Sequence, residues 1–308
     1  MTATTPASNS APLTILVAGA SGLIGTELVT QLRADGYEVR TLVRREATAP
    51  GEFTWSPRAG TIAPGALDSV DAVISLSGAS LGRIPWTRDY RAAILESRVL
   101  TTSTLATAIA RSTQPPSVFL SASAVGIYGD RPGELLTEES TRGRGFLADV
   151  VEQWESAAQI AAAATRVVTF RTGFVIGDGG GMKPLLLLTK FGLGSRIASG
   201  AQNLPWISLH DEAAAIRHLL TSEIEGAVNL VGPVPSTFEM MTRALARRLR
   251  RPHLFVLPRF VISTVMGEAG RQLLLVSQRA VPQRLTDDGF VFRHQTVAAA
   301  IDALVSKR

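Results

Sequence analysis

Hydrophobic positions along this chain recur at two spacings, and the alternation between them predicts the fold. Short segments typical of strands, most of them largely apolar, cover residues 14–18, 38–43, 71–76, 117–121 and 166–170. Longer segments with the i, i+3, i+4 spacing of helices lie between these runs, notably residues 23–32, 87–111 and 146–164. Alternating strands and helices form parallel sheets that are covered by helices on both faces. The pattern therefore predicts a doubly wound α/β domain.

The chain changes character after residue 177. A glycine-rich turn over 177–181 leads into an irregular stretch, helical spacing returns at 211–221, and an apolar strand follows at 227–231. We expect this strand to rejoin the main sheet, which makes the second, smaller and mostly helical domain discontinuous. The predicted division is a disordered leader (1–12), an α/β domain (13–177 plus 208–232) and a C-terminal domain on the substrate side (178–207 plus 233–308).

The composition of the 308 residues is that of a folded globular protein, and it excludes several kinds of chemistry. Hydrophobic residues make up 45% of the chain and charged residues 19%, and no apolar run reaches the roughly 18 residues needed to span a bilayer. The absence of cysteine excludes disulfides, thiolate catalysis and iron–sulfur clusters. Because the sequence shows no export signal, we expect a cytoplasmic protein without a membrane partner.

The charge balance does not favour nucleic acid as a partner. The 31 basic and 26 acidic residues give a net charge of +5, which is a modest excess. The densest basic run, residues 243–251, has Leu245 and Leu249 at helical spacing. We interpret this run as the solvated face of a helix, with a polyanion site as the alternative.

The strongest chemical signal is a glycine pattern between the first predicted strand and the first predicted helix. Gly19 permits a tight turn, Gly22 lets the backbone approach a pyrophosphate, and Gly25 lets the helix pack closely on the strand. The N-terminus of the following helix then faces the phosphates. This position predicts a dinucleotide-binding domain of the Rossmann type; a glycine turn without a ligand is the alternative.

The end of the second predicted strand indicates which dinucleotide binds. NAD-specific sites have an acidic residue there that binds the ribose hydroxyls, whereas this strand ends with Val43, Arg44 and Arg45. A charge-assisted contact to a 2′-phosphate contributes roughly 1.5–3 kcal/mol, or about ten- to a hundredfold in affinity. We therefore predict NADP(H) as the cofactor, bound by Arg44 and Arg45. In the alternative interpretation, both arginines are ordinary solvated ends of a strand.

Several short motifs follow one another in a characteristic order and spacing. They are the glycine turn and residues 53–57, 77–79, 86–87, 96–98, 121–130, 145–147, 154–155, 171–173, 251–252, 267–268 and 282–285. With them, nearly the whole chain resembles the extended short-chain dehydrogenase/reductase superfamily, and within it the NAD(P)-binding epimerase-family proteins with a C-terminal domain of unknown function. The resemblance implies cofactor contacts from Gly19, Ser21, Gly22, Leu23, Ile24, Arg44, Leu76 and Gly78.

The sequence lacks a catalytic pair that the resemblance leads us to expect. Active members of the superfamily use Tyr-x-x-x-Lys near a serine: the tyrosine exchanges a proton with the substrate oxygen, and the lysine lowers the tyrosine pKa and holds the ribose. In this chain, the residues four positions after the three tyrosines are Thr41, Ile94 and Pro132. The helix that would carry the pair has Phe146 and Val150 near the expected positions.

Ser123 and Tyr128 are the residues that we expect to act in catalysis. Ser123 follows a buried strand, where the superfamily serine would hydrogen-bond the substrate carbonyl, although a one-residue ambiguity could shift this match to Ala124. Tyr128 could supply a proton, or it could only shape its loop. Lys183 could line the substrate cleft or lie on the surface.

Residues 206–211 depart from the pattern of the subgroup. Its members carry histidine at the position of Ser208 and aspartate at that of His210. His210 and Asp211 could form an acid–base pair here, or Asp211 could be the N-cap of a helix. The four histidines of the chain are too dispersed for a recognisable metal spacing, so we predict no metal.

These observations predict an NADP(H)-dependent oxidoreductase or epimerase that acts on a small polar or nucleotide-linked substrate. Retention of the complete phosphate turn favours this function. The alternative is a catalytically weak NADP(H)-binding sensor or partner-binding module, which the missing Tyr-x-x-x-Lys pair favours. The sequence leaves the oligomeric state open.

Overall fold

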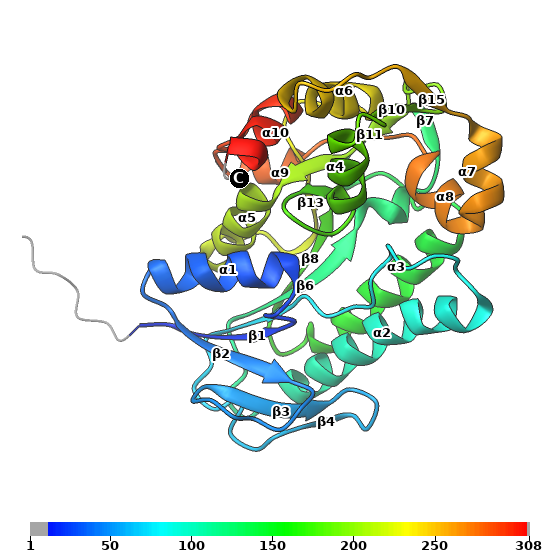
Figure 1. Cartoon of the computed structure of the whole chain (residues 1–308). Helices are drawn as coiled ribbons and strands as arrows, with labels where there is room; N and C mark the ends of the chain where they lie inside the picture. Colours follow the sequence, from blue (N-terminus) through cyan, green and yellow to red (C-terminus); the bar gives the residue numbers. More distant parts are fainter. Residues whose placement is uncertain (1–11, 307–308) are drawn as a thin grey trace, which may run out of the picture.

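The computed structural model describes residues 12–306, and Figure 1 shows a large sheet flanked by helices, with a further group of helices above it. Most of the predicted leader, residues 1–11, lies outside the described residues. The strands of the large sheet are β1 (Thr14–Ala18), β2 (Glu38–Val43), β3 (Glu52–Ser56), β4 (Thr61–Ile62), β5 (Ala72–Ser75), β6 (Val118–Ala124), β8 (Arg166–Thr172) and β13 (Gly226–Leu230). The helices packed on it are α1 (Leu23–Ala34), α2 (Arg88–Ala110), α3 (Phe146–Ala158) and α5 (Leu209–Thr221).

The other elements are short. The strands are β7 (Arg131–Leu136), β9 (Phe174–Ile176), β10 (Ser195–Ile197), β11 (Asn203–Leu204), β12 (Trp206–Ser208), β14 (Ser236–Thr237), β15 (Phe255–Leu257) and β16 (Gln278–Ala280). The helices are α4 (Met182–Lys190), α6 (Phe238–Arg248), α7 (Arg259–Val265), α8 (Gly267–Leu274), α9 (Gln283–Asp287) and α10 (Val297–Ser306), and single 3₁₀ turns cover Val125–Tyr128 and Gln159–Ala161.

The order of the strands confirms the predicted doubly wound topology. It runs β13-β8-β6-β5-β1-β2-β3-β4, and all neighbours are parallel except β3 and β4. From β1 the chain proceeds outward to β2 and β3 and then returns to β5 on the opposite side of β1. In open sheets of this kind, ligands bind in the crevice at the carboxyl ends of the two strands on either side of such a reversal.

Both faces of the sheet are buried, as the apolar runs predict. In β1, Ile15 and Val17 pack in the cluster with residues of α1 and α5, whereas Leu16 and Ala18 pack on the opposite face with α2. Successive side chains of a strand point to opposite faces. A strand buried on both faces is therefore mostly apolar, as residues 15–18 of β1 are.

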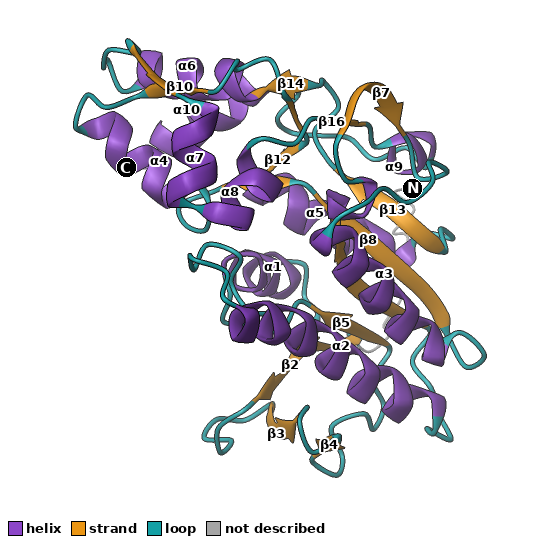
Figure 2. Cartoon of the chain, turned by 90° about the vertical axis from the view of Figure 1, so that its right-hand side faces the viewer, coloured by secondary structure: helices purple, strands orange, loops and turns teal. Residues whose placement is uncertain are grey.

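A second core lies in the C-terminal part of the chain. It contains Trp206, Met241 and Ile301 and joins α4, α6, α7 and α10, which Figure 2 shows grouped together above α1 and α2. The strand predicted at 227–231 is β13, and its pairing with β8 confirms the return to the main sheet. The division into two domains at the predicted boundaries stays a prediction.

The structure differs from the sequence-based expectation in several places. The stretch after residue 181, expected to be irregular, holds α4 and the short strands β10 and β11. β3 and β4 extend the sheet beyond β2, and sequence analysis missed them because in β3 only Trp55 is buried, so that no continuous apolar run marks the strand. The helix expected over 146–164 ends at Ala158, where a 3₁₀ turn over Gln159–Ala161 follows. The mostly helical segment after residue 233 also holds three short strands.

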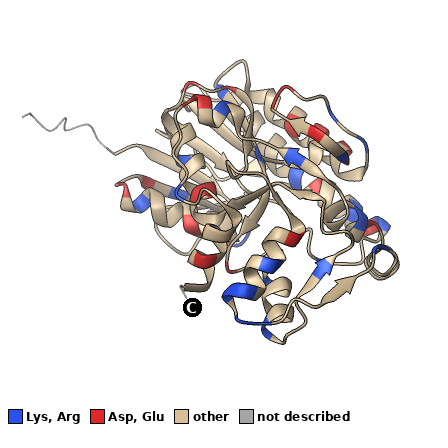
Figure 3. Cartoon of the chain, turned by 90° about the horizontal axis from the view of Figure 1, so that it is seen from above, with Lys and Arg blue, Asp and Glu red and all other residues tan. Residues whose placement is uncertain are grey.

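Charged residues lie mainly in the peripheral helices and loops, whereas most of the central strands contain none (Figure 3). In α6, the arginine-rich helix, Arg243 pairs with Glu239 and Arg248 pairs with Asp302. Within residues 12–306, no helix combines the length and the apolar character that crossing a bilayer requires.

Candidate functional site

The turn between β1 and α1 brings backbone atoms so close together that side chains do not fit at two of its glycines. Gly19 has a φ of +86°, and a Cβ there would lie 2.9 Å from the carbonyl carbon of Leu76. A Cβ on Gly25 would lie 2.3 Å from the carbonyl oxygen of Gly19. Glycine adopts this left-handed conformation without strain, and its lack of a Cβ lets α1 pack against the turn. The geometry agrees with the structural roles predicted for both glycines.

The N-terminus of α1 presents free hydrogen-bond donors at this turn. Gly22 is the N-cap residue and provides no side-chain cap, and the first bond within the helix runs from the Thr26 N–H to the Gly22 oxygen. The N–H groups of Leu23, Ile24 and Gly25 therefore have no partner within the helix. Together with the positive end of the helix dipole, they form a site suited to a phosphate. The site is open, because Gly22 and the adjacent Ser21 are exposed.

The two arginines after β2 have different surroundings. Arg45 Nη1 and Nη2 donate to the two carboxylate oxygens of Glu52 at 2.8 and 2.6 Å, and these bonds lower the pKa of Glu52 to about 2. Arg44 is exposed and makes no side-chain hydrogen bond or ion pair with any described residue. Of these two arginines, Arg44 is thus the one whose guanidinium is free to pair with a ligand anion. The predicted contact from Arg45 would compete with Glu52 for the same N–H groups.

Leu76 and Gly78 lie on the other side of the glycine turn, directly after β5. The Leu76 N–H donates to the Ala18 oxygen at 2.8 Å, which fixes this segment beside the turn. Leu23 also contacts the glycine-rich segment 177–181, since a Cβ on Gly179 would lie 3.1 Å from Leu23 Cδ1. The structure therefore brings a loop from the second half of the chain to the start of α1.

These features fit a dinucleotide. Backbone donors without partners suit the pyrophosphate, positions that exclude a Cβ allow close approach of the ligand, and an unpaired cation after β2 suits a phosphate on the adenosine ribose.

Ser123 lies at the carboxyl end of β6 and is bonded to α3. Its Oγ donates to Glu155 Oε1 at 2.5 Å, and only 3% of the residue is exposed. Arg171 Nε and Nη2 donate to the two oxygens of the same carboxylate at 2.8 and 2.9 Å. Burial lowers the pKa of Arg171, but the hydrogen bonds and charge of Glu155 outweigh it and raise this pKa above its usual value. Ser123 thus faces an ionised pair.

Glu155 and Arg171 were missed by the sequence-based search for site residues. Both lie in motifs that support the family resemblance, but no catalytic pattern includes them. The available signal was a charged residue inside a buried segment: Arg171 follows the buried residues 167–170 of β8 and is itself 8% exposed. Buried charges of this kind require a partner, and Glu155 provides it.

Tyr128 is at the centre of a buried polar network. Its hydroxyl donates to Asn229 Oδ1 at 2.7 Å and accepts from Arg171 Nη1 at 3.0 Å, and the side chain has no exposed surface. Burial raises the pKa of Tyr128, and Arg171 offsets part of this effect. The structure therefore joins Tyr128 to Ser123 through Arg171 and Glu155. In this arrangement the hydroxyl is enclosed by protein groups, and its catalytic role stays a prediction.

The start of α3 carries no acid–base group where the Tyr-x-x-x-Lys pair would lie. Phe146 packs edge-on against Trp86, with ring centroids 5.7 Å apart, and Val150 is buried in the same cluster. These positions therefore provide apolar surface.

The segment 206–211 is structural in this chain. Ser208, and not Asp211, is the N-cap of α5, because the helix begins at Leu209, two residues before the predicted start. Asp211 accepts hydrogen bonds from the Arg293 and His294 N–H groups at 2.9 and 3.0 Å and is 1% exposed. This carboxylate anchors the segment before α10. Its distance to His210 Nδ1 is 3.5 Å, at the limit of a hydrogen bond.

Lys183 lies in the first turn of α4 and is exposed. Within residues 12–306, histidine and carboxylate side chains form no group of three or more that could hold a metal ion.

Comparisons with known proteins agree with this geometry. Residues 15–232 match the NAD dependent epimerase/dehydratase family, and residues 257–304 match a domain of unknown function, DUF1731. An epimerase family protein of Mycobacterium leprae is 37% identical over 293 residues, which cover 93% of this chain and 94% of the relative. The human epimerase family protein SDR39U1 is 34% identical over 297 residues, covering 95% and 99% of the two chains.

A solved structure supports the same assignment. The crystal structure of human SDR39U1 (isoform 2) with NADPH superposes with a TM-score of 0.89 at 31% identity and covers 96% of this chain and all of that one. The predicted family and the Rossmann-type fold with a small helical C-terminal region are confirmed. The chain therefore belongs to the NAD dependent epimerase/dehydratase family.

Proposed function

We propose that this protein is an NADP(H)-dependent oxidoreductase or epimerase that acts on a small polar or nucleotide-linked substrate. The observation that supports this most strongly is the uncapped N-terminus of α1 at a glycine turn that leaves no room for side chains. The human relative, at 31% identity, was crystallised with NADPH. Gly19, Ser21, Gly22, Leu23, Ile24 and Gly25 line the proposed phosphate site, with Leu76 and Gly78 opposite.

Arg44 favours NADP(H) over NAD(H). It is exposed at the end of β2 and unpaired among residues 12–306, so a 2′-phosphate would meet a cation that has no competing partner. Arg45 is the second predicted contact, and its ion pair with Glu52 makes it the weaker one.

Ser123 is the residue that we propose to contact the reacting oxygen. When bound, the cofactor supplies a hydride acceptor or donor. Because the Ser123 hydroxyl proton points to Glu155, the Oγ lone pairs remain free to accept a hydrogen bond from a substrate alcohol. During oxidation of that alcohol, Ser123 Oγ accepts the released proton as Glu155 takes the serine's own proton. Arg171 is a positioning residue that holds Glu155.

A second function is favoured by the apolar start of α3 and by the burial of Tyr128. Positioned acid–base catalysis typically contributes about a hundred- to ten-thousandfold in rate. The absence of the Tyr-x-x-x-Lys pair reduces this contribution. The protein would then bind NADP(H) as a sensor or as a module that contacts a partner.

The Ser123→Ala variant distinguishes the two functions. The experiment measures NADP⁺ reduction by a panel of alcohols and sugar nucleotides, interconversion of the epimers of the same substrates, and NADPH affinity, for the wild type and the variant. Turnover by the wild type that is lost in Ser123→Ala at unchanged NADPH affinity supports the enzyme. NADPH binding without turnover of any substrate in either protein supports the sensor.

A further inference from the structure

Exposed apolar side chains are concentrated in the C-terminal part of the chain. Among residues 12–306, sixteen large hydrophobic side chains are exposed, and nine of them lie in two short segments, residues 187–193 and 254–265. Phe191 is 75% exposed, Leu254 80% and Phe260 71%. Single exposed hydrophobic side chains are common on globular proteins, whereas a cluster of them marks an interaction site.

The two segments lie side by side. Residues 195–197 of β10 pair in parallel with residues 255–257 of β15. A Cβ on Gly192 would lie 3.8 Å from Pro252 Cγ, and one on Gly194 would lie 3.1 Å from the Pro252 oxygen. The turn after α4 therefore contacts the residues before β15. We call the surface that both segments form the apolar patch; it includes Leu187, Phe191, Leu193, Leu254, Phe255 and Phe260.

Both a helix and a strand of the patch expose apolar side chains where surface elements usually carry polar ones. In α4, Leu186 is buried while Leu187 and Leu188 are exposed, so the helix is apolar on its inner face and over much of its outer face. In β15, Phe255 and Val256 are both exposed, although successive side chains of a strand point to opposite faces. The strand therefore projects from the protein.

The same part of the chain carries cations and no carboxylate. Residues 182–207 and 240–267 contain nine lysine and arginine residues and no aspartate or glutamate, although acidic residues are nearly as numerous as basic ones in the whole chain. Arg250, Arg251 and Arg259 are exposed and form no ion pair with any described residue. The apolar patch thus lies within a surface of positive charge.

This combination discriminates between possible occupants of the patch. A second copy of the chain would bring its own cations against these, so like charges oppose a symmetric contact. A nucleic acid would pair with the cations but would leave the leucine and phenylalanine side chains in water. An anionic lipid surface suits both features, because its headgroups pair with the cations and its acyl boundary buries the apolar side chains.

We propose that the apolar patch binds the surface of an anionic membrane, with Phe191, Leu254 and Phe260 at the boundary between headgroups and acyl chains. Arg250 and Arg251 then pair with lipid phosphates. Side chains that project fit a fluid layer, which closes around them, better than the fixed groove of a partner protein. The sequence-based expectation of no membrane partner considers spanning segments and export signals, and a peripheral contact needs neither. Binding does not require NADP(H).

The experiment is co-sedimentation of the full chain with two kinds of vesicle, one of phosphatidylcholine alone and one in which about a third of the lipid is phosphatidylglycerol. Phe191→Ser and Leu254→Ser each remove an apolar side chain of the patch. Val291→Ser is the matched control, because Val291 is 82% exposed but lies outside the patch. Each patch substitution should lower the partition coefficient for the anionic vesicles about tenfold, and the control should not change it.

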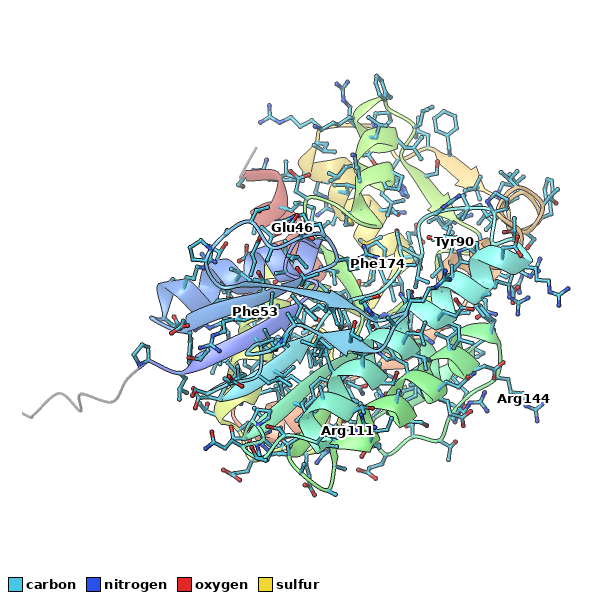
Figure 4. The ribbon with its side chains drawn as sticks, turned by 90° about the horizontal axis from the view of Figure 1, so that it is seen from below. Glu46, Phe53, Tyr90, Arg111, Arg144 and Phe174 are labelled. Carbon is cyan, nitrogen blue, oxygen red and sulfur yellow. The ribbon has the colours of Figure 1, made fainter. Side chains whose placement is uncertain are left out.

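The contribution of charge is measured in the same assay. The wild type should bind the anionic vesicles and not the neutral ones, and about 1 M NaCl should weaken binding because it shortens the Debye length to about 3 Å. Arg250→Gln/Arg251→Gln should lower the partition coefficient about ten- to thirtyfold. Arg58→Gln/Arg111→Gln removes the same net charge at two other exposed positions and should retain binding. Figure 4 shows Arg111 at the end of the molecule opposite the C-terminal helices.

Four results would overturn the inference. They are failure of the wild type to bind anionic vesicles, wild-type partitioning of both serine variants, an equal loss in the two double arginine variants, and a wild-type dimer in solution that both serine variants dissociate. The last result would assign the patch to a second copy of the chain. Because every altered side chain is exposed, the variants should melt like the wild type. If one serine variant is unstable, the other decides.

Discussion

Ser123 and Glu155 are joined by a 2.5 Å hydrogen bond between the end of β6 and the middle of α3. The same carboxylate holds Arg171 through two further bonds, so a serine at the proposed active site is fixed by a buried ion pair. The pair thus connects the sheet to a helix and orients a hydroxyl. The effect of the ion pair on stability and its effect on the serine hydroxyl can be measured separately.

Glu155→Gln should destabilise the fold by about 3–5 kcal/mol, because it leaves Arg171 as a buried charge without a counterion. Urea unfolding measures this change. Glu152→Gln is the matched control on the same helix: Glu152 is exposed and lies 3.5 Å from Arg142, so its loss should cost less than about 1 kcal/mol. Equal unfolding midpoints for the two variants would contradict the assigned role of Glu155.

Glu212 should make the protein less stable as the pH rises. Burial raises its pKa to about 8, although the hydrogen bond from Thr172 opposes this shift. The folded protein therefore retains a proton that the unfolded chain releases near its ordinary pKa of 4.5. The contribution of this proton to the free energy of unfolding is fully present below that pH. It is lost as the pH rises through about 8, by up to about 1.4 kcal/mol per pH unit.

The Glu212→Gln variant tests this pH dependence, because the neutral amide can still accept the bond from Thr172. Free energies of unfolding between pH 5 and 9 should fall less steeply for the variant than for the wild type. Glu223→Gln, a change at an exposed position just beyond α5, should retain the wild-type slope. Parallel curves for the wild type and Glu212→Gln would mean that Glu212 is ionised in the folded protein.

Two glycine substitutions in the phosphate turn should separate folding from binding. In Gly25→Ala, the new Cβ would lie 2.3 Å from the Gly19 oxygen, which should lower stability by about 1–3 kcal/mol and abolish NADPH binding. In Gly22→Ala the corresponding distance is 3.3 Å, so the fold should survive while the methyl group obstructs the pyrophosphate. Thermal melting and calorimetry measure the two effects. Wild-type NADPH affinity in Gly22→Ala would place the pyrophosphate elsewhere.

The sequence predicts the central sheet well, because burial on both faces leaves runs such as residues 14–18 with no polar interruption. It predicts β3 poorly, since this strand near the sheet edge buries only Trp55. The start of α5 was placed two residues late for a similar reason: the N-cap Ser208 follows a short buried strand, and local pattern alone does not mark where strand ends and helix begins.

The candidate site is predicted in part. A glycine turn is a local feature, and so Gly19, Gly22 and Gly25 can be recognised from neighbouring residues. The ion pair of Glu155 and Arg171 joins residues 16 positions apart on different elements. Such contacts arise from the tertiary fold. The same is true of the contacts of Tyr128 with Asn229 and Arg171, which bury its hydroxyl completely.

Cofactor preference is the central claim, and calorimetric titration of the wild type with NADPH and, separately, NADH tests it most directly. Repeating both titrations on Arg44→Ala and on Arg45→Ala assigns the preference to a residue. We expect tighter binding of NADPH than of NADH, a loss of about ten- to a hundredfold for NADPH alone in Arg44→Ala, and a smaller loss in Arg45→Ala because of Glu52. Equal affinity for the two dinucleotides, or binding of neither, would contradict the account.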